Sequence, residues 1–178
     1  MPPAVRRSKP GSGRGAGRAA GSGQGIRVWR ITSPRHVGDA FTGEGARLYG
    51  GRWNPPGVAL VYTSSTLSLC ALEYFVHLDP TLAPDRLAAI PADLPAGFEV
   101  PLLPLADLPA DWRSYPAPGR LQDIGSAWVR EARSFALRVP SAIIPDEHNI
   151  LLNPRHPDHH RLRVHAAQAF SFDPRMWK

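Results

Sequence analysis

The most constraining stretch of this chain runs from Tyr49 to Gly57 and reads YGGRWNPPG. Gly50 and Gly51 allow backbone conformations and close approaches that other residues do not adopt. Arg52 supplies a planar fork of hydrogen-bond donors, and Trp53 supplies a flat stacking surface. The segment therefore predicts a site that recognises anions and aromatic rings. A plain turn that connects two strands has the same composition, so that alternative stays open here.

Length and composition indicate one soluble domain with an extension. The 178 residues, 43% of them hydrophobic, suffice for a packed core. No apolar run approaches the roughly 20 residues of a membrane span, and the N-terminus lacks the apolar part of a secretion signal. We therefore expect a cytoplasmic protein without membrane association. The single cysteine, Cys70, lies in an apolar helical pattern that predicts a buried thiol and not a nucleophile.

The net charge of +6 is concentrated at the N-terminus. Residues 1–25 contain five basic and no acidic side chains, whereas the rest of the chain contains 16 basic and 15 acidic ones. Seven glycines between residues 11 and 25 predict a disordered basic tail, followed by a folded domain over 26–178. The nearly neutral domain argues against a nucleic-acid-binding or ribonuclease-like protein. The tail, and aromatic residues able to stack on bases, keep that alternative open.

The hydrophobic pattern predicts an α+β domain of short strands and helices. Residues 27–31 alternate so that Val28 and Arg30 share one face and Trp29 and Ile31 the other. Prolines limit the strands expected between residues 81 and 118. We expect strands over 27–31, 58–63, 87–90, 98–103, 135–139, 149–154 and 163–172, and helices over 33–41, 67–78 and 127–134.

Glu73 is the one acidic residue in the expected helix over 67–78. Its neighbours at helical spacing are mainly apolar, and burying an unpaired carboxylate costs several kcal/mol. Three arrangements satisfy this constraint. Glu73 lies at an exposed helix margin, pairs with an arginine such as Arg30 or Arg52, or is positioned for chemistry.

Six segments follow one another in a recognisable order. They are Arg30 in the first strand, GGRWNPPG, Tyr62 before Thr63-Ser64, Glu73 in LEYFVHL, Ser141 in RVPSAIIP and Asn149 in NILLNPRHP. In this order they resemble the RES-domain toxins, a family named for Arg, Glu and Ser. The resemblance extends from about Ile26 to the C-terminus. Ser64 stands where the family pattern leads us to expect a small residue such as alanine.

The resemblance implies a compact single domain similar to the ADP-ribosyltransferase fold. It also implies a toxin of a type II toxin–antitoxin system that cleaves NAD+ at the nicotinamide–ribose bond. The acceptor is water or phosphate in a glycohydrolase or phosphorylase, or a protein target in an ADP-ribosyltransferase. NAD+ is then a consumed substrate, and no cofactor is expected. The implied partner is a cognate Xre-like antitoxin with a helix-turn-helix domain. A non-catalytic interaction module is the remaining alternative.

The motif residues suit this chemistry. Loss of nicotinamide leaves positive charge on the ribose, which the Glu73 carboxylate would stabilise while orienting the acceptor. Arg30 and Arg52 would hold the pyrophosphate or ribose, because guanidinium forks match phosphate oxygens. Ser141 would hydrogen-bond nicotinamide or its ribose and is not expected to be a nucleophile. The expected substrate-binding side chains are Arg30, Tyr49, Trp53, Tyr62 and Asn149.

Structural alternatives exist for several of these residues. Arg30 would pair with an acid at a sheet edge, Tyr62 would belong to the core, and Ser141 would be an ordinary turn hydroxyl. Asn149 and Asn153 would be turn residues that bond their own backbone. The HPDHH segment lacks a zinc-ligand spacing, so we expect no metal at His156, His159 or His160.

Overall fold

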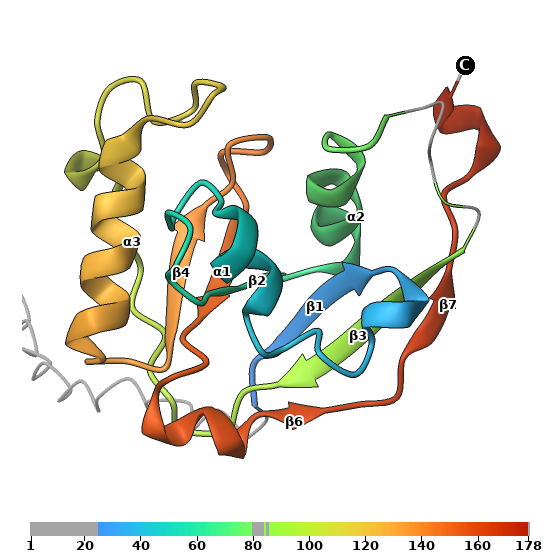
Figure 1. Cartoon of the computed structure of the whole chain (residues 1–178), viewed down its shortest axis with the longest axis horizontal. Helices are drawn as coiled ribbons and strands as arrows, with labels where there is room; N and C mark the ends of the chain where they lie inside the picture. The colour runs from blue at the N-terminus through green and yellow to red at the C-terminus, as the bar shows by residue number, and fades with distance from the viewer. Residues whose placement is uncertain (1–24, 80–83, 85, 178) are drawn as a thin grey trace, which may run out of the picture.

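The structure is a computed structural model that describes residues 25–79, 84 and 86–177. These residues form one seven-stranded antiparallel sheet, with helices packed on it (Figure 1). The strands lie in the order β4-β5-β2-β1-β3-β6, and β7 also pairs with β3. The α+β class expected from the pattern is confirmed. The strands are β1 (Arg27–Thr32), β2 (Val61–Ser64), β3 (Leu87–Asp93), β4 (Ala136–Pro140), β5 (His148–Leu152), β6 (Arg163–Val164) and β7 (Gln168–Phe170).

Helices pack on the sheet at two separate places on one face (Figure 1). Paired residues of neighbouring strands point to the same face, so the register shows which strands each helix covers. Helix α2 packs on β1 and β3, and helix α3 packs on β4 and β5. No helix among the described residues is long and apolar enough to cross a membrane. The α-helices are α1 (Glu44–Tyr49), α2 (Leu67–Phe75) and α3 (Gly119–Glu131), with 3-10 turns at Pro34–His36, Leu105–Asp107, Pro157–Arg161 and Pro174–Trp177.

In the described part of the chain, the core has one cluster on the first face of the sheet and two on the second. Val28 and Val61 belong to the first-face cluster, which Ala40 and Phe41 cover. On the second face, side chains of α2 surround Ile31, and side chains of α3 surround Leu151. The alternation expected for 27–31 is therefore confirmed.

Strands β1 and β2 meet at one point. Within the described residues, the register pairs them only at Trp29 and Ser64, whereas β1 pairs with β3 along its whole length. Beyond this point the Arg30 guanidinium replaces the backbone pairing, because its Nη1 donates to the carbonyl of Tyr62 at 2.8 Å. The sheet thus consists of two halves joined at a narrow joint.

Several expected elements differ in extent or are absent. Helix α1 was not expected from the sequence, and glycines with positive φ, Gly43 and Gly50, flank it. The expected strand over 98–103 is wrong: only Leu102 forms an isolated bridge to β4, because Pro101 and Pro104 lack N–H donors.

The other differences concern element boundaries. The expected helix over 33–41 shrinks to Pro34–His36, and α3 begins at Gly119, well before residue 127. The strand expected over 163–172 is divided into β6 and β7. The division lies opposite Pro91 of β3, which accepts a hydrogen bond from His165 but has no N–H to donate. The expected tail over 1–25 lies outside the described residues except for Gly25.

Helix α3 approaches the glycine-rich segment closely at Gly125. A Cβ added there would lie 1.9 Å from the Trp53 carbonyl oxygen, whereas one added at Gly119 of the same helix would meet nothing within 4 Å. We therefore expect Gly125→Ala to lower the free energy of unfolding by about 2 kcal/mol or more, because backbone must move. Gly119→Ala is the matched control and should stay within about 0.5 kcal/mol. Urea unfolding of both variants measures the difference, and equal stability would contradict the close approach.

Candidate active site

The carboxylate of Glu73 is held by two hydrogen bonds to the same oxygen. Ser141 Oγ donates to Glu73 Oε1 at 2.7 Å, and Asn149 Nδ2 donates to the same atom. Among the described residues, nothing donates to Oε2. Glu73 lies in the last turn of α2, a helix capped by Thr66, whose hydroxyl accepts from the Leu69 N–H. One carboxylate oxygen is therefore anchored, and the other is available to a ligand.

Ser141 lies in the turn that follows β4. Its oxygen accepts hydrogen bonds from the N–H groups of Ile143 and Ile144 at 3.1 and 3.0 Å, and its proton goes to Glu73. The residue is 0% exposed. A hydroxyl with one proton already donated cannot also donate to nicotinamide. The expected direct contact of Ser141 with substrate does not fit this geometry, because its proton is held by Glu73.

The side-chain amide of Asn149 connects Ser64 to Glu73. It lies on β5 opposite Ser64 of β2, and its Oδ1 accepts from Ser64 Oγ at 2.6 Å while its Nδ2 reaches Glu73. The alternative that Asn149 bonds its own backbone in a turn is therefore wrong. For Asn153 that alternative is confirmed, because its Oδ1 accepts from the Arg155 N–H two residues on.

Arg52 lies close enough to Glu73 for their charges to interact, and Arg30 bonds the Tyr62 carbonyl between β1 and β2. Among the described residues Glu73 forms no salt bridge, so the arrangement in which it pairs with Arg30 or Arg52 is not the one adopted. Burial lowers the pKa of Arg30, whose Nε has no partner in the described part of the chain. Burial also lowers the pKa of Arg52, and the negative charge of Glu73 opposes that shift. Both cations are thus desolvated, and the charge of Glu73 acts on Arg52 without a direct contact.

Arg52 fastens a loop that sequence patterns missed. Its Nη1 donates to the Trp112 carbonyl at 2.6 Å, and Nη1 and Nη2 both lie 3.3 Å from the Ser114 carbonyl. The neighbouring Arg113 donates from Nε to the Ala142 carbonyl at 3.0 Å, next to Ser141. The loop around Trp112 therefore connects the glycine-rich segment to the Ser141 turn. Nothing in the proline-rich sequence between residues 101 and 118 signals this role.

Tyr62 is part of the scaffold beneath the site. Its hydroxyl donates to Asn54 Oδ1 at 2.7 Å and accepts from the Trp53 N–H at 2.9 Å, and burial raises its pKa. A Cβ added at Gly51 would lie 2.6 Å from this hydroxyl. The glycine therefore admits Tyr62, a side chain of the protein itself. This is the core arrangement that the sequence left open.

The other two expected aromatic residues have opposite environments. Trp53 is 2% exposed and packs with Leu121 of α3 and Leu151 of β5, so it offers no face to a ligand. Its expected stacking role is wrong. Tyr49 ends α1 and is 84% exposed, which leaves its ring free to meet a ligand or a partner.

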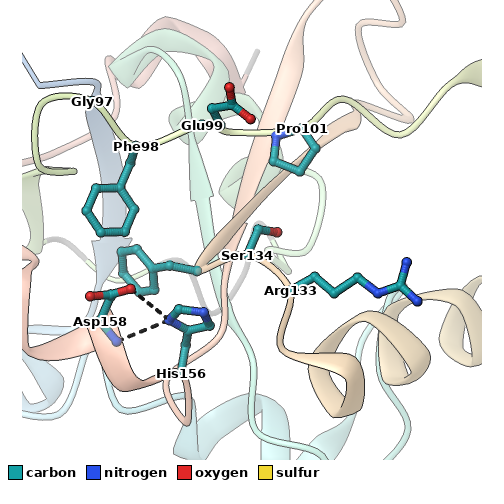
Figure 2. A pocket seen from close by; sticks show the side chains of 9 residues that line it. Gly97, Phe98, Glu99, Pro101, Arg133, Ser134, His156 and Asp158 are labelled. Carbon is teal, nitrogen blue, oxygen red and sulfur yellow. Dashed lines mark hydrogen bonds and ion pairs between the residues drawn. The ribbon is translucent and has the colours of Figure 1, made fainter.

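The hollow drawn in Figure 2 lies away from these residues. It has a volume of about 480 Å³ and is lined by Phe98, Glu99, Arg133 and His156, among others. His156 Nδ1 accepts from the Asp158 N–H at 3.1 Å. His159 Nε2 lies 3.0 Å from the Phe41 carbonyl oxygen. Within the described residues, no group of three His, Cys, Asp or Glu side chains is arranged to hold a metal ion.

Comparisons with known proteins assign the family. A model described as "RES domain" matches residues 27–174. The chain is 40% identical over 152 residues to "Toxin Res" of Yersinia enterocolitica, covering 84% of this chain and 98% of the relative. The chain belongs to the RES-domain family. This confirms the resemblance carried by the ordered motifs.

Three further comparisons relate this RES domain to proteins with named activities and to a solved fold. It is 37% identical over 155 residues to "Prs ADP-ribosylating toxin" of a Sphingobium strain, covering 83% and 94% of the two chains. A shorter match, 43% over 49 residues, links 25% of it to 26% of "NAD(+) phosphorylase MbcT" of Mycobacterium tuberculosis. A chain of the M. tuberculosis MbcT–MbcA toxin–antitoxin complex shares its fold, with a TM-score of 0.66, 19% identity and coverage of 87% and 88%.

The Tyr62 hydroxyl should matter for stability. Tyr62→Phe leaves the Trp53 N–H without its partner inside the RES domain, which costs about 1 to 3 kcal/mol of unfolding free energy. Tyr49→Phe, the exposed control, should change stability by less than about 0.5 kcal/mol. Thermal and urea unfolding test both. A Tyr62→Phe variant as stable as the parent would show that the hydroxyl bonds contribute nothing.

Cys70 should be unreactive in the folded RES domain. It is 7% exposed, and burial raises the pKa of its thiol to about 11, so the thiolate is scarce at pH 8. We expect a thiol reagent to modify the native protein at least about 100-fold more slowly than the urea-unfolded protein. The chain has one cysteine, so the signal is unambiguous. Equal rates would contradict the buried placement.

Proposed function

We propose that this RES domain cleaves NAD+ at the bond between nicotinamide and ribose. The observation that carries the proposal is the carboxylate of Glu73, anchored through one oxygen and open at the other, with the charge of Arg52 near it. The names of the relatives support it, since one is an ADP-ribosylating toxin and another an NAD+ phosphorylase.

The chemistry requires a negative charge at a defined place. The bond between the anomeric carbon and nicotinamide breaks, and nicotinamide leaves neutral with the bonding electron pair. The ribose keeps a positive charge, as in glycoside hydrolysis. The free oxygen of Glu73 opposes that charge, or binds a ribose hydroxyl, while Ser141 and Asn149 hold the other oxygen. An acceptor then adds to the carbon and loses its proton.

The arginines suit the half of NAD+ that stays bound. Arg30 and Arg52 carry charge in surroundings that lower their pKa, so a pyrophosphate would be attracted strongly to them. Tyr49 is the exposed aromatic candidate for stacking. NAD+ is consumed as a substrate in this scheme, and no cofactor takes part.

The biological role that follows is that of a toxin restrained by a partner. Relatives named as toxins support this role, and the chain of similar fold belongs to a toxin–antitoxin complex. The partner we propose is a cognate Xre-like antitoxin with a helix-turn-helix domain. Because NAD+ and such a partner are found in the cytoplasm, the protein would act there.

Transfer of ADP-ribose to a protein is the second candidate. The Sphingobium relative, named as an ADP-ribosylating toxin and 37% identical over most of the chain, favours it. Water, phosphate and a protein side chain all attack the same carbon, so Glu73 serves each acceptor in the same way. Hydrolysis, phosphorolysis and transfer to a protein all break the same nicotinamide–ribose bond. They differ only in the acceptor.

The test is an NMR time course of the purified protein with NAD+, with and without inorganic phosphate. We expect nicotinamide release to fall at least about 100-fold in Glu73→Gln, which keeps the hydrogen-bond acceptor but removes the charge. Glu44→Gln is the control, because Glu44 is exposed and paired with Arg47. The co-product identifies the acceptor as water when it is ADP-ribose and as phosphate when it is ADP-ribose-1″-phosphate.

The other outcomes separate the alternatives. Intact NAD+ in both buffers, with a modified protein after addition of a cell extract, would establish the transferase. Intact NAD+ under every condition would reject the enzyme and favour an interaction module. In that case Glu73→Gln and Arg52→Ala would weaken partner binding. Salt-sensitive binding of nucleic acid that vanishes on deleting residues 1–25 would confine that activity to the tail.

A further inference from the structure

Ser64 occupies the joint between the two halves of the sheet. It pairs with Trp29 of β1 on one side and with Asn149 of β5 on the other. The residue is 3% exposed, and a buried hydroxyl is costly unless it is hydrogen-bonded. Its Oγ donates to Asn149 Oδ1 at 2.6 Å. The family pattern led us to expect a small residue such as alanine here, so this hydroxyl needs a reason.

We propose that Ser64 is a positioning residue for Glu73, acting through the side-chain amide of Asn149. The inference rests on the proposed function, because it concerns the carboxylate assigned to the reaction. An amide has an acceptor end and a donor end, and Ser64 occupies the acceptor end. The donor end then faces Glu73. A flipped amide would set Oδ1 against the carboxylate, and two acceptors repel.

The direction of these bonds follows from the groups themselves. The Ser64 hydroxyl is the donor in its pair with Asn149, because an amide oxygen can only accept. The donors therefore run in one direction, from Ser64 of β2 through Asn149 of β5 to Glu73 of α2.

The consequence lies at Glu73. Its side chain has three rotatable bonds, and it is fixed by donors from two other segments, β5 and the Ser141 turn. Loss of the Asn149 orientation removes one of these donors and lets the carboxylate rotate. The open oxygen then points at the reacting carbon for a smaller fraction of the time, which lowers the rate of the chemical step more than substrate affinity.

The experiment compares Ser64→Ala with Thr63→Val. Thr63 carries the adjacent buried hydroxyl. Its side chain lies on the opposite face of the sheet from Ser64 and donates to the Ile150 carbonyl. Nicotinamide release should show kcat about 10-fold lower in Ser64→Ala, with KM for NAD+ changed less than about 2-fold. Thr63→Val should lose stability but keep kcat. Equal loss of kcat in both variants would reduce Ser64 to a purely structural residue and overturn the proposal.

A double-mutant cycle tests the route through Asn149. If Ser64 acts through that amide, Ser64→Ala should have no further effect on kcat in the Asn149→Ala background. Independent, multiplying effects of the two substitutions would overturn the route.

A second readout does not depend on activity. The side-chain amide protons of Asn149 give a pair of NMR signals, assigned by their loss in Asn149→Asp. They should shift strongly in Ser64→Ala and much less in Thr63→Val. An unchanged pair in Ser64→Ala overturns the proposal even if the wild type leaves NAD+ intact. NAD+ that stays intact under every condition, together with shifted signals, rejects the enzyme but keeps the orienting role of Ser64.

Discussion

The rest of the structure depends on the narrow joint at Trp29 and Ser64. Because β1 and β2 pair there and then diverge, the Tyr62 carbonyl is left to the Arg30 guanidinium instead of a neighbouring strand. Ser64 also pairs with Asn149 of β5, and so connects the joint to Glu73. A fully paired ladder between β1 and β2 would have satisfied the backbone and left the Arg30 guanidinium without this role.

The ordered motifs gave the family and most of the residues around Glu73. Ser141 and Asn149 are far from Glu73 in sequence, yet both donate to its carboxylate. A motif series predicts which residues meet, because each occupies an equivalent place in every member of a fold. It does not predict how they meet. The acceptor of the Ser141 proton and the orientation of the Asn149 amide depend on geometry between segments about 70 residues apart.

The errors share a physical origin. Trp53 looks like a stacking surface in the sequence, but the absence of a side chain at Gly125 lets α3 cover it. Gly51 looks like a ligand-facing position, but it accommodates the Tyr62 hydroxyl. In both cases the glycine makes room for the protein itself. Sequence shows where space is made and not what fills it, since the occupant comes from a distant segment.

Arg52 holds the loop around Trp112 through the carbonyls of Trp112 and Ser114. This attachment couples the loop to any ligand that binds Arg52. A guanidinium that serves two carbonyls serves an incoming anion less well, so the two compete for the same N–H groups. Binding free energies are reciprocal. If an anion weakens the attachment of the loop to Arg52, the attached loop lowers the affinity for the anion by the same factor. Binding of an anion to Arg52 would therefore change how readily a protease cuts the segment around Trp112.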